Sequence, residues 1–348
     1  MAEALARDWF DLVPKVELHL HLEGAIPLPV LWELVCRHGG DPEVGDPAAL
    51  AERFRYRDFD HFIRTWVWKN RFLRTYDDFT RIAAAVAREL VRQRVRYAEV
   101  FYSPLDFRAS GLGIQGLTTA IRRGLDQVPE VEVALILDLV RDFGPEEAQR
   151  TLAEAAEVRG LGVIGIGLGG SERAYPAPLF AAVFAQAHRL GLRTTAHAGE
   201  ADGPASVRAA LERLGVERIG HGVRAIEDPA VVAALVERRI PLEICPTSNV
   251  CTGVVPGLAA HPITALRDAG VVVTVGTDDP AMFGCTLAGE LRLLERVLGW
   301  SRDEVRAVIL AAVASSWLPP ARRSSLAAEF TASPAWVGAD GAGRPDPR

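Results

Sequence analysis

Histidines and an aspartate stand at or just after the ends of short apolar segments of this sequence. His19 and His21 are two residues apart in one such segment, so both imidazoles would project from the same face of a β-strand. His197 ends a second apolar segment and Asp278 follows a third. Imidazole and carboxylate ligands around an open position suit catalytic zinc best, although iron, cobalt or manganese can occupy similar sites. We therefore predict one divalent metal ion, taken as zinc, held by these four residues.

Further polar side chains could handle protons beside that ion, which lowers the pKa of a bound water from about 15.7 to about 7. Glu200 follows His197 by three residues and could carry a proton from the water to a substrate ring nitrogen. His221 ends the next apolar segment and could hydrogen-bond the nucleophile, and Asp279 could accept a hydrogen bond from the substrate. Each residue alone also fits a structural role, such as Asp278 as a helix cap. Their joint occurrence at matching segment ends favours a catalytic site.

These residues can meet only if the fold brings the segment ends together. Short β-branched, apolar segments alternate with longer Ala-, Leu-, Arg- and Glu-rich segments of helical period, which is typical of repeated βα units. Strands buried on both faces are nearly continuous in apolar residues, and eight of them close a (β/α)8 TIM barrel of the α/β class. In such a barrel the chemistry lies at the C-terminal ends of the strands. The eight predicted strands are 16–22, 97–102, 131–139, 162–168, 193–197, 218–221, 241–245 and 271–276.

The rest of the chain is organised around this barrel. We expect one domain over 1–330 and a flexible tail over 331–348, which is rich in Gly, Pro and Asp. An aromatic-rich stretch, 31–76, predicts extra helices after the first strand, and part of it, 54–72, could close over the substrate as a lid. Other expected helices include 84–93, 146–159, 179–190 and 229–238. Structural roles are assigned to the remaining histidines, which are His38, His61, His188 and His261.

Composition and charge limit the kinds of partner. The formal net charge of −6 and the lack of a Lys/Arg-rich run argue against nucleic acid and favour a small neutral substrate. The first residues lack the pattern of a signal peptide, and no apolar run could span a bilayer, so we expect a cytoplasmic protein without a membrane partner. The four cysteines form no C-x-x-C pair. A homo-oligomer is compatible with the sequence, which does not fix the oligomeric state.

Five motifs, HLHLEGAIP, HAGE, RIGHG, EICPTSN and TDDPAMF, occur in this order between residues 19 and 283. The match runs from about residue 14 to beyond residue 290. Together they resemble the adenosine deaminase family of the amidohydrolase superfamily. The resemblance implies zinc-dependent hydrolytic deamination of a 6-aminopurine nucleoside, in which metal-activated hydroxide attacks C6 and ammonia leaves. Glu200 would act as the proton shuttle and His221 would orient the hydroxide. A backbone contact from Gly170 to purine N3 and a hydrogen bond between Asp279 and purine N7 are also implied. The implied zinc ligands are His19, His21, His197 and Asp278.

Two departures from the family pattern concern the substrate. Typical adenosine deaminases carry Asp at the position of Glu23, near the ribose, and a D-L-A-G-D/N-E loop where this chain reads GLGGSE at 167–172. The pocket beside the sugar should therefore differ. Relatives act on adenosine, on adenine or on 6-amino-6-deoxyfutalosine, an adenosine-like nucleoside of menaquinone synthesis with a bulky 5′ substituent. Because the D-S-S-E loop usual in adenine deaminases is absent, a nucleoside is favoured, adenosine or 6-amino-6-deoxyfutalosine, with adenine as the alternative.

Other functions fit the sequence less well. The G-x-G-x-x-G spacing at 165–170 occurs in dinucleotide-binding dehydrogenases, but no helix opens directly after it and no acidic residue follows at the required distance. Cytidine-type zinc deaminases need P-C-x-x-C together with H-x-E, and the cysteine motif is missing. Another amidohydrolase would often use a two-metal site with a carboxylated lysine, and no lysine ends a predicted strand. A metal-containing binding protein would have no need of Glu200 or His221.

Overall fold

Eight parallel strands form the centre of the molecule. A computed structural model describes residues 7–57 and 59–337. All eight predicted strands are confirmed, and no strand end differs from its predicted position by more than two residues. The strands are β1 (Lys15–His21), β2 (Val95–Tyr102), β3 (Glu132–Asp138), β4 (Val163–Gly167), β5 (Arg193–Ala198), β6 (Arg218–His221), β7 (Leu242–Ile244) and β8 (Val273–Val275).

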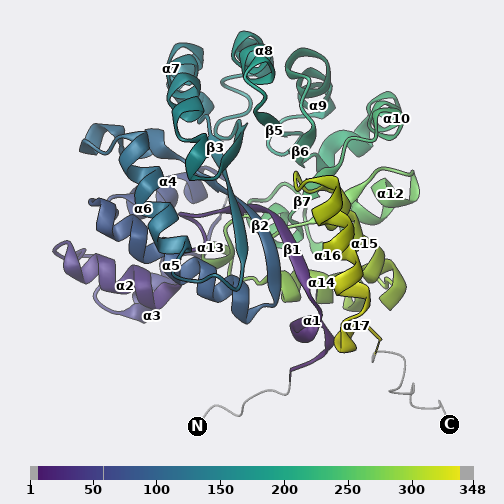
Figure 1. The fold of residues 1–348 in the computed structure, drawn as a ribbon, viewed down its shortest axis with the longest axis horizontal. Coiled ribbons are helices and arrows are strands. Elements are labelled where there is room, and N and C mark those ends of the chain that lie inside the picture. The colour runs from purple at the N-terminus through teal and green to yellow at the C-terminus, as the bar shows by residue number, and fades with distance from the viewer. Residues whose placement is uncertain (1–6, 58, 338–348) are drawn as a thin grey trace.

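The strands close into a barrel. Each pairs in parallel with its neighbours in sequence, in the order β1 to β8. The seam between β8 and β1 is closed just beyond β8, where the backbone N–H of Asp278 donates to the carbonyl of His19 and the N–H of His21 donates to the carbonyl of Asp278, each at 2.9 Å. Helices surround the strands on the outside (Figure 1). The predicted (β/α)8 barrel is therefore confirmed.

The helices that connect successive strands cover the outer face of the barrel. Their amphipathic sequences bury Ala, Leu, Ile and Val against the strands, as in α5, where Ile82, Ala83 and Val86 are buried. The predicted helices at 84–93, 146–159, 179–190 and 229–238 correspond to α5, α7, α8 and α10. The main connecting helices are α5 (Tyr76–Arg92), α6 (Ile114–Leu125), α7 (Gly144–Glu157), α8 (Ala181–Arg189), α9 (Pro204–Ala209), α10 (Pro229–Arg238) and α12 (Ile263–Asp268).

Additional short helices lie beside the barrel after β1 and at both ends of the chain. The extra helices predicted after the first strand are found as α2 (Leu28–Arg37), α3 (Pro47–Arg53) and α4 (Phe59–Asn70). The first helix is α1 (Trp9–Leu12), and two short helices, α11 (Pro246–Cys251) and α13 (Pro280–Phe283), follow β7 and β8 directly. The C-terminal part contains α14 (Leu287–Arg296), α15 (Arg302–Ser315), α16 (Pro320–Thr331) and α17 (Pro334–Val337).

The predicted tail over 331–348 is helical in its first part. Thr331 completes α16, and Trp336 of α17 is buried, with its carbonyl accepting a hydrogen bond from Arg306 at 2.7 Å. These residues therefore pack on the domain, and the tail boundary at 331 was placed too early. Positions 338–348 lie outside the described residues. No helix in the described part of the chain is long and apolar enough to cross a membrane.

Candidate active site

Side chains from three strand ends converge at the C-terminal end of the barrel. The Nε2 atom of His197 lies 3.1 Å from Nε2 of His19 and 3.2 Å from Nε2 of His21. The Oδ1 atom of Asp278 lies 3.5 Å from His19 Nε2 and 3.3 Å from His21 Nε2. Four ligand atoms held tetrahedrally at about 2.0–2.1 Å from one zinc ion would be about 3.3 Å apart. The spacing of these four atoms therefore fits a single metal ion.

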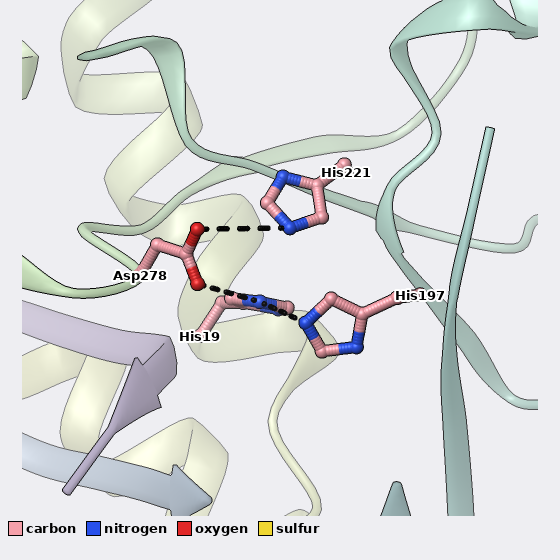
Figure 2. A group of neighbouring side chains, drawn as sticks. All are labelled: His19, His197, His221 and Asp278. Carbon is pink, nitrogen blue, oxygen red and sulfur yellow. Dashed lines mark hydrogen bonds and ion pairs between the residues drawn. The ribbon is translucent and has the colours of Figure 1, made fainter. Parts of the chain in front are cut away.

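His221 adjoins this cluster but faces different atoms. Its Nε2 lies 3.8 Å from Oδ2 of Asp278, whereas the two histidines of β1 face Oδ1. The same Nε2 lies 3.7 Å from Oε2 of Glu200, is buried, and has no hydrogen-bond partner among the described residues. His221 is thus better placed to contact a molecule beside the cluster than to complete it. Figure 2 shows four buried residues that place one ligand atom each within 4.8 Å of one another, namely His19, His197, His221 and Asp278.

A buried ionic network fixes the ring of His19. Its Nδ1 is 2.8 Å from Oε2 of Glu243, in the middle of β7, so the ring can donate from Nδ1 and keep the Nε2 lone pair for an ion. The other oxygen of Glu243 accepts from Nε of Arg218 at 2.5 Å, and Nη2 of Arg218 donates to Glu99 at 2.5 Å. All four side chains are at most 1% exposed. The guanidinium of Arg218 also stacks on Trp317, 3.6 Å from the ring centroid.

Asp278 is held in an unusual conformation by its neighbours. Its φ is +62°, in the left-handed region that non-glycine residues rarely adopt, and the φ of His221 is +60°. Such strain persists only where the surroundings enforce it, and it concentrates at functional sites. For Asp278 the surroundings are the two seam hydrogen bonds and the Ser248 hydroxyl, which donates to Oδ2 at 2.6 Å. The backbone therefore directs Oδ1 toward the histidine nitrogens.

Glu200 lies in a loop that another carboxylate organises. The side chain of Glu172 accepts hydrogen bonds from the backbone N–H groups of Gly199 at 2.6 Å, Glu200 at 3.2 Å and Asp202 at 2.9 Å. The loop can make this turn because Gly199 has a φ of +68°. Burial, followed by the charges of Asp278 and Glu172, raises the pKa of Glu200 well above its usual range. This environment therefore favours the protonated form of the carboxyl group more than an exposed site would.

Asp279 faces the same space from the opposite side. Its Oδ1 is buried and has no hydrogen-bond partner among the described residues. Burial and the charge of Asp278 raise the pKa of Asp279 well above its usual range. A Cβ at Gly24 would lie only 1.6 Å from Oδ1 of Asp279, so a glycine there leaves room for the carboxyl group. The available oxygen suits a hydrogen bond with a ligand.

A cavity of about 250 Å³ opens from the cluster toward the solvent. Its inner end is lined by three residues of the cluster, His21, His197 and Asp278, together with Glu200, His221 and Asp279, and Gly170 also lines it. Glu23 does not line the cavity. Its Oε1 accepts from the backbone N–H of Ser103 at 3.0 Å, and Ser103 does line it. Burial raises the pKa of Glu23 to about 7. Glu23 therefore lies behind the wall rather than at its surface.

Three carboxylates line the outer wall of the cavity. Asp106 has one oxygen 2.9 Å from both Trp66 Nε1 and Asn70 Nδ2. Asp138 ends β3 and accepts from the backbone N–H of Gly169 at 2.8 Å. No lysine or arginine is among the lining residues of this cavity. Burial raises the pKa of Asp106 and raises that of Asp138 to about 7. This wall thus offers carboxyl oxygens and no cationic group to whatever occupies the cavity.

The third carboxylate is joined to the loop that departs from the family pattern. Asp142 accepts from both the backbone N–H and the hydroxyl of Ser171. A Cβ at Gly169 would lie 2.7 Å from Oδ2 of Asp138, and one at Gly170 would lie 2.2 Å from Oδ2 of Asp142. The glycine pair therefore allows the loop to pack closely against these acidic side chains. Although Ser171 carries no carboxylate, Asp142 supplies one beside it.

Helix α4 contributes the aromatic side of the cavity. Phe62, Ile63, Trp66 and Val67 line it, and Val67 is 59% exposed at its rim. The predicted lid over 54–72 therefore includes residues that line the cavity, while its movement stays a prediction. Phe59 belongs to the same segment, but its side chain lies outside the described part of the structure.

Sequence reasoning missed the residues that support the site. Glu243, Glu99 and Arg218 stand within strands that are buried on both faces, so each charged group needed a partner. That requirement was the signal that could have identified them. Asp138 also ends a strand, so the rule that identified His221 could have identified it as well. Asn249, whose amide lies 3.0 Å from Nδ1 of His221, had no distinguishing signal beyond its motif.

Known proteins that resemble this chain are deaminases and an amidohydrolase. An aminodeoxyfutalosine deaminase of Streptomyces avermitilis is 38% identical over 332 residues, covering 93% of this chain and 92% of that protein. The crystal structure of adenine deaminase from Arthrobacter aurescens has a TM-score of 0.87 and 32% identity, covering 92% of this chain and 98% of that one. An amidohydrolase from Burkholderia ambifaria with bound Zn has a TM-score of 0.85 and 27% identity, covering 95% of this chain and 93% of that one.

The family itself follows from the match that spans most of the chain. The family model described as adenosine deaminase matches residues 14–333, which includes every strand of the barrel and all the clustered residues. Its relatives are deaminases that act on aminopurine compounds, and the barrel here carries a buried His/Asp group able to hold a metal ion. This chain therefore belongs to the adenosine deaminase family and is a deaminase of the amidohydrolase type.

Proposed function

We propose that the protein is a zinc-dependent deaminase of unphosphorylated 6-aminopurine nucleosides. The observation that carries this proposal is the convergence of His19, His21, His197 and Asp278 beside a cavity lined by Glu200 and His221. Imidazole nitrogens 3.1 and 3.2 Å apart, together with a carboxylate, form a donor set that suits zinc. When bound there, zinc would lower the pKa of a water molecule toward neutrality.

The protein side chains would then handle the protons and the ring. Glu200 would take a proton from the attacking water and deliver it to N1 of the purine, which makes C6 more electrophilic. The Nε2–H of His221 would hold the oxygen of the nucleophile in line with C6. Asp279 would face N7 and the backbone of Gly170 would face N3, which orients the ring. The second proton of the attacking water would pass to the exocyclic amine, so that the C6–N bond breaks, ammonia leaves and the oxygen stays on C6 as a carbonyl.

A nucleoside is favoured over a nucleotide by the outer wall of the cavity. Phosphate recognition relies on arginine, lysine or clustered N–H donors. The wall instead presents Asp106, Asp138 and Asp142, which can accept hydrogen bonds from sugar hydroxyls. These acceptors lie beyond the metal cluster, where a bare purine would leave them unused. An uncharged extension at the 5′ position would meet the exposed rim residues Val67 and Phe143.

Adenine is a second candidate substrate because of the likeness to the Arthrobacter aurescens adenine deaminase over nearly the whole chain. The two candidate substrates differ in whether they contact the three aspartates of the outer wall. If adenine is the substrate, the three aspartates make no contact with it, and their replacement by asparagine leaves its turnover unchanged. If a nucleoside is the substrate, the same replacements raise its KM.

The zinc-loaded protein should be tested with adenosine, 6-amino-6-deoxyfutalosine, 5′-deoxy-5′-methylthioadenosine, 5′-AMP and adenine, with ammonia release as the readout. We expect one of the uncharged or 5′-extended nucleosides to have the highest kcat/KM. Glu200→Gln should lower kcat by about 10²–10⁴-fold, and a matched control, Glu217→Gln at a surface ion pair with Arg193, should not. Full activity of Glu200→Gln, or no ammonia from any of these compounds, would overturn the proposal.

A further inference from the structure

A chain of hydrogen bonds leads from a backbone N–H group to the active-site face of His221. The N–H of Ile263, at the start of α12, donates to Nδ1 of His261 at 3.1 Å. Nε2 of His261 is 3.2 Å from Oδ1 of Asn249, and Nδ2 of Asn249 is 3.0 Å from Nδ1 of His221. The three side chains are 5%, 0% and 1% exposed, respectively. Water therefore offers them few alternative partners.

The direction of every bond in this chain follows from its first member. A backbone N–H can only donate, so Nδ1 of His261 must be the acceptor and its proton must be on Nε2. That Nε2–H in turn requires an acceptor, which fixes the side-chain oxygen of Asn249 toward His261. The NH2 group of Asn249 is then directed at Nδ1 of His221. The reverse orientation of the amide would place two donors against each other at Ile263.

The last bond determines which nitrogen of His221 carries the proton. Because Nδ1 accepts from Asn249, a neutral His221 has its proton on Nε2. That N–H points into the space between Glu200 Oε2 at 3.7 Å and Asp278 Oδ2 at 3.8 Å and has no partner among the described residues. Burial lowers the pKa of His261 to about 4, which agrees with a neutral ring in the middle of the chain.

We propose that His261 and Asn249 are positioning residues that hold His221 as the Nε2–H tautomer, so that it donates a hydrogen bond to the oxygen that attacks the substrate. The role of His221 toward that oxygen rests on the proposed function, whereas the tautomer does not. His261 was assigned a structural role from its loop context. Its place in this series of hydrogen bonds connects the loop before α12 to His221. His261 itself contacts none of the proposed metal ligands and would not contact the substrate.

The isosteric change Asn249→Asp tests the chain most sharply. It keeps an acceptor for His261 but replaces the donor facing His221 by a second acceptor, so Nδ1 of His221 must gain a proton. In zinc-loaded protein labelled with 15N-histidine, long-range 1H–15N spectra distinguish the two tautomers. We expect an Nε2–H pattern for His221 in the unmodified protein, assigned by its loss in His221→Asn. In Asn249→Asp we expect an Nδ1–H signal from the same residue.

A second variant removes the Nε2–H group of His261, which orients the side-chain amide of Asn249. In His261→Phe the amide of Asn249 is free to rotate, and we expect a mixture of His221 tautomers, a kcat about tenfold lower and a KM changed less than twofold. The control is His188→Phe, since His188 donates to the carbonyl of Leu214 far from the cavity. An Nδ1–H pattern for His221 in the unmodified protein, or unchanged His221 signals in both variants, would overturn the proposal. If the tautomer pattern is as expected but no aminopurine is deaminated, the proposed function fails and the tautomer assignment stands.

Discussion

Replacing Glu243 by Gln should weaken metal binding at a distance from the ligands. The carboxylate uses one oxygen for His19 Nδ1 and the other for Arg218 Nε. A glutamine has a single side-chain oxygen, and the charged guanidinium would take it. The amide NH2 would then face Nδ1 of His19, so that its proton moves to Nε2, the atom that faces His197 and Asp278. His19 could bind an ion only after this arrangement is reversed.

The size of the effect can be estimated from the kind of contact that is lost. Removing the partner that orients a metal-ligating histidine lowers metal affinity by about 10–100-fold, which corresponds to about 1.4–2.7 kcal/mol. The matched control is Glu99→Gln, at the other end of the same arginine. It also removes a buried charge partner of Arg218 but does not contact His19. Both variants should be less stable than the unmodified protein, yet only Glu243→Gln should lose zinc affinity to this extent.

Competition with a chromophoric chelator measures the zinc dissociation constant of each variant directly and does not depend on the substrate. Thermal unfolding of the metal-free proteins measures the cost to the fold separately. Zinc affinity of Glu243→Gln within twofold of the unmodified protein would refute the reasoning. An equal loss in Glu99→Gln would also refute it, because the effect would then come from general loosening of the barrel interior.

Three further outcomes are expected. Asp142→Lys should raise kcat/KM for 5′-AMP relative to adenosine by about tenfold or more, because it reverses a charge on the cavity wall; the exposed surface change Asp126→Lys should leave the ratio unchanged. Glu172→Gln should lower kcat more than it raises KM, since one amide oxygen cannot accept from three N–H groups; equal changes in both would contradict a positioning role. Burial raises the pKa of Glu290 to about 7, above its unfolded value of about 4.3. The folded protein therefore loses stability as pH rises from about 4 to about 7. Glu290→Gln should raise the free energy of unfolding, measured by urea denaturation, more at pH 8 than at pH 5, by up to about 3 kcal/mol.

The barrel and the convergence of the site histidines with Asp278 could be predicted because each depends on local sequence. Apolar segments and helical periods identified the strands, and the rule that strand ends meet at one face of a barrel brought His19, His197 and Asp278 together. The residues that hold the site side chains in place could not be predicted in this way. The partners of Glu243 are 25 and 224 residues away and that of His221 is 28 residues away, with directions set by packing. The role assigned to Glu23 near the sugar assumed that its side chain lines the cavity, but it bonds to the backbone of Ser103 behind the wall.

The seam of the barrel has a consequence for how the protein is made. His21 and Asp278 are joined there by a backbone hydrogen bond, and the proposed ligands come from both sides of it. During synthesis the first of these residues leaves the ribosome more than 250 positions before the last. A nascent chain therefore exposes a His-x-His pair without the other two proposed ligands, so binding of an ion by all four requires ring closure. Metal loading would then report that synthesis has passed β8, and a chain truncated before that point would be recognisable by its failure to retain zinc.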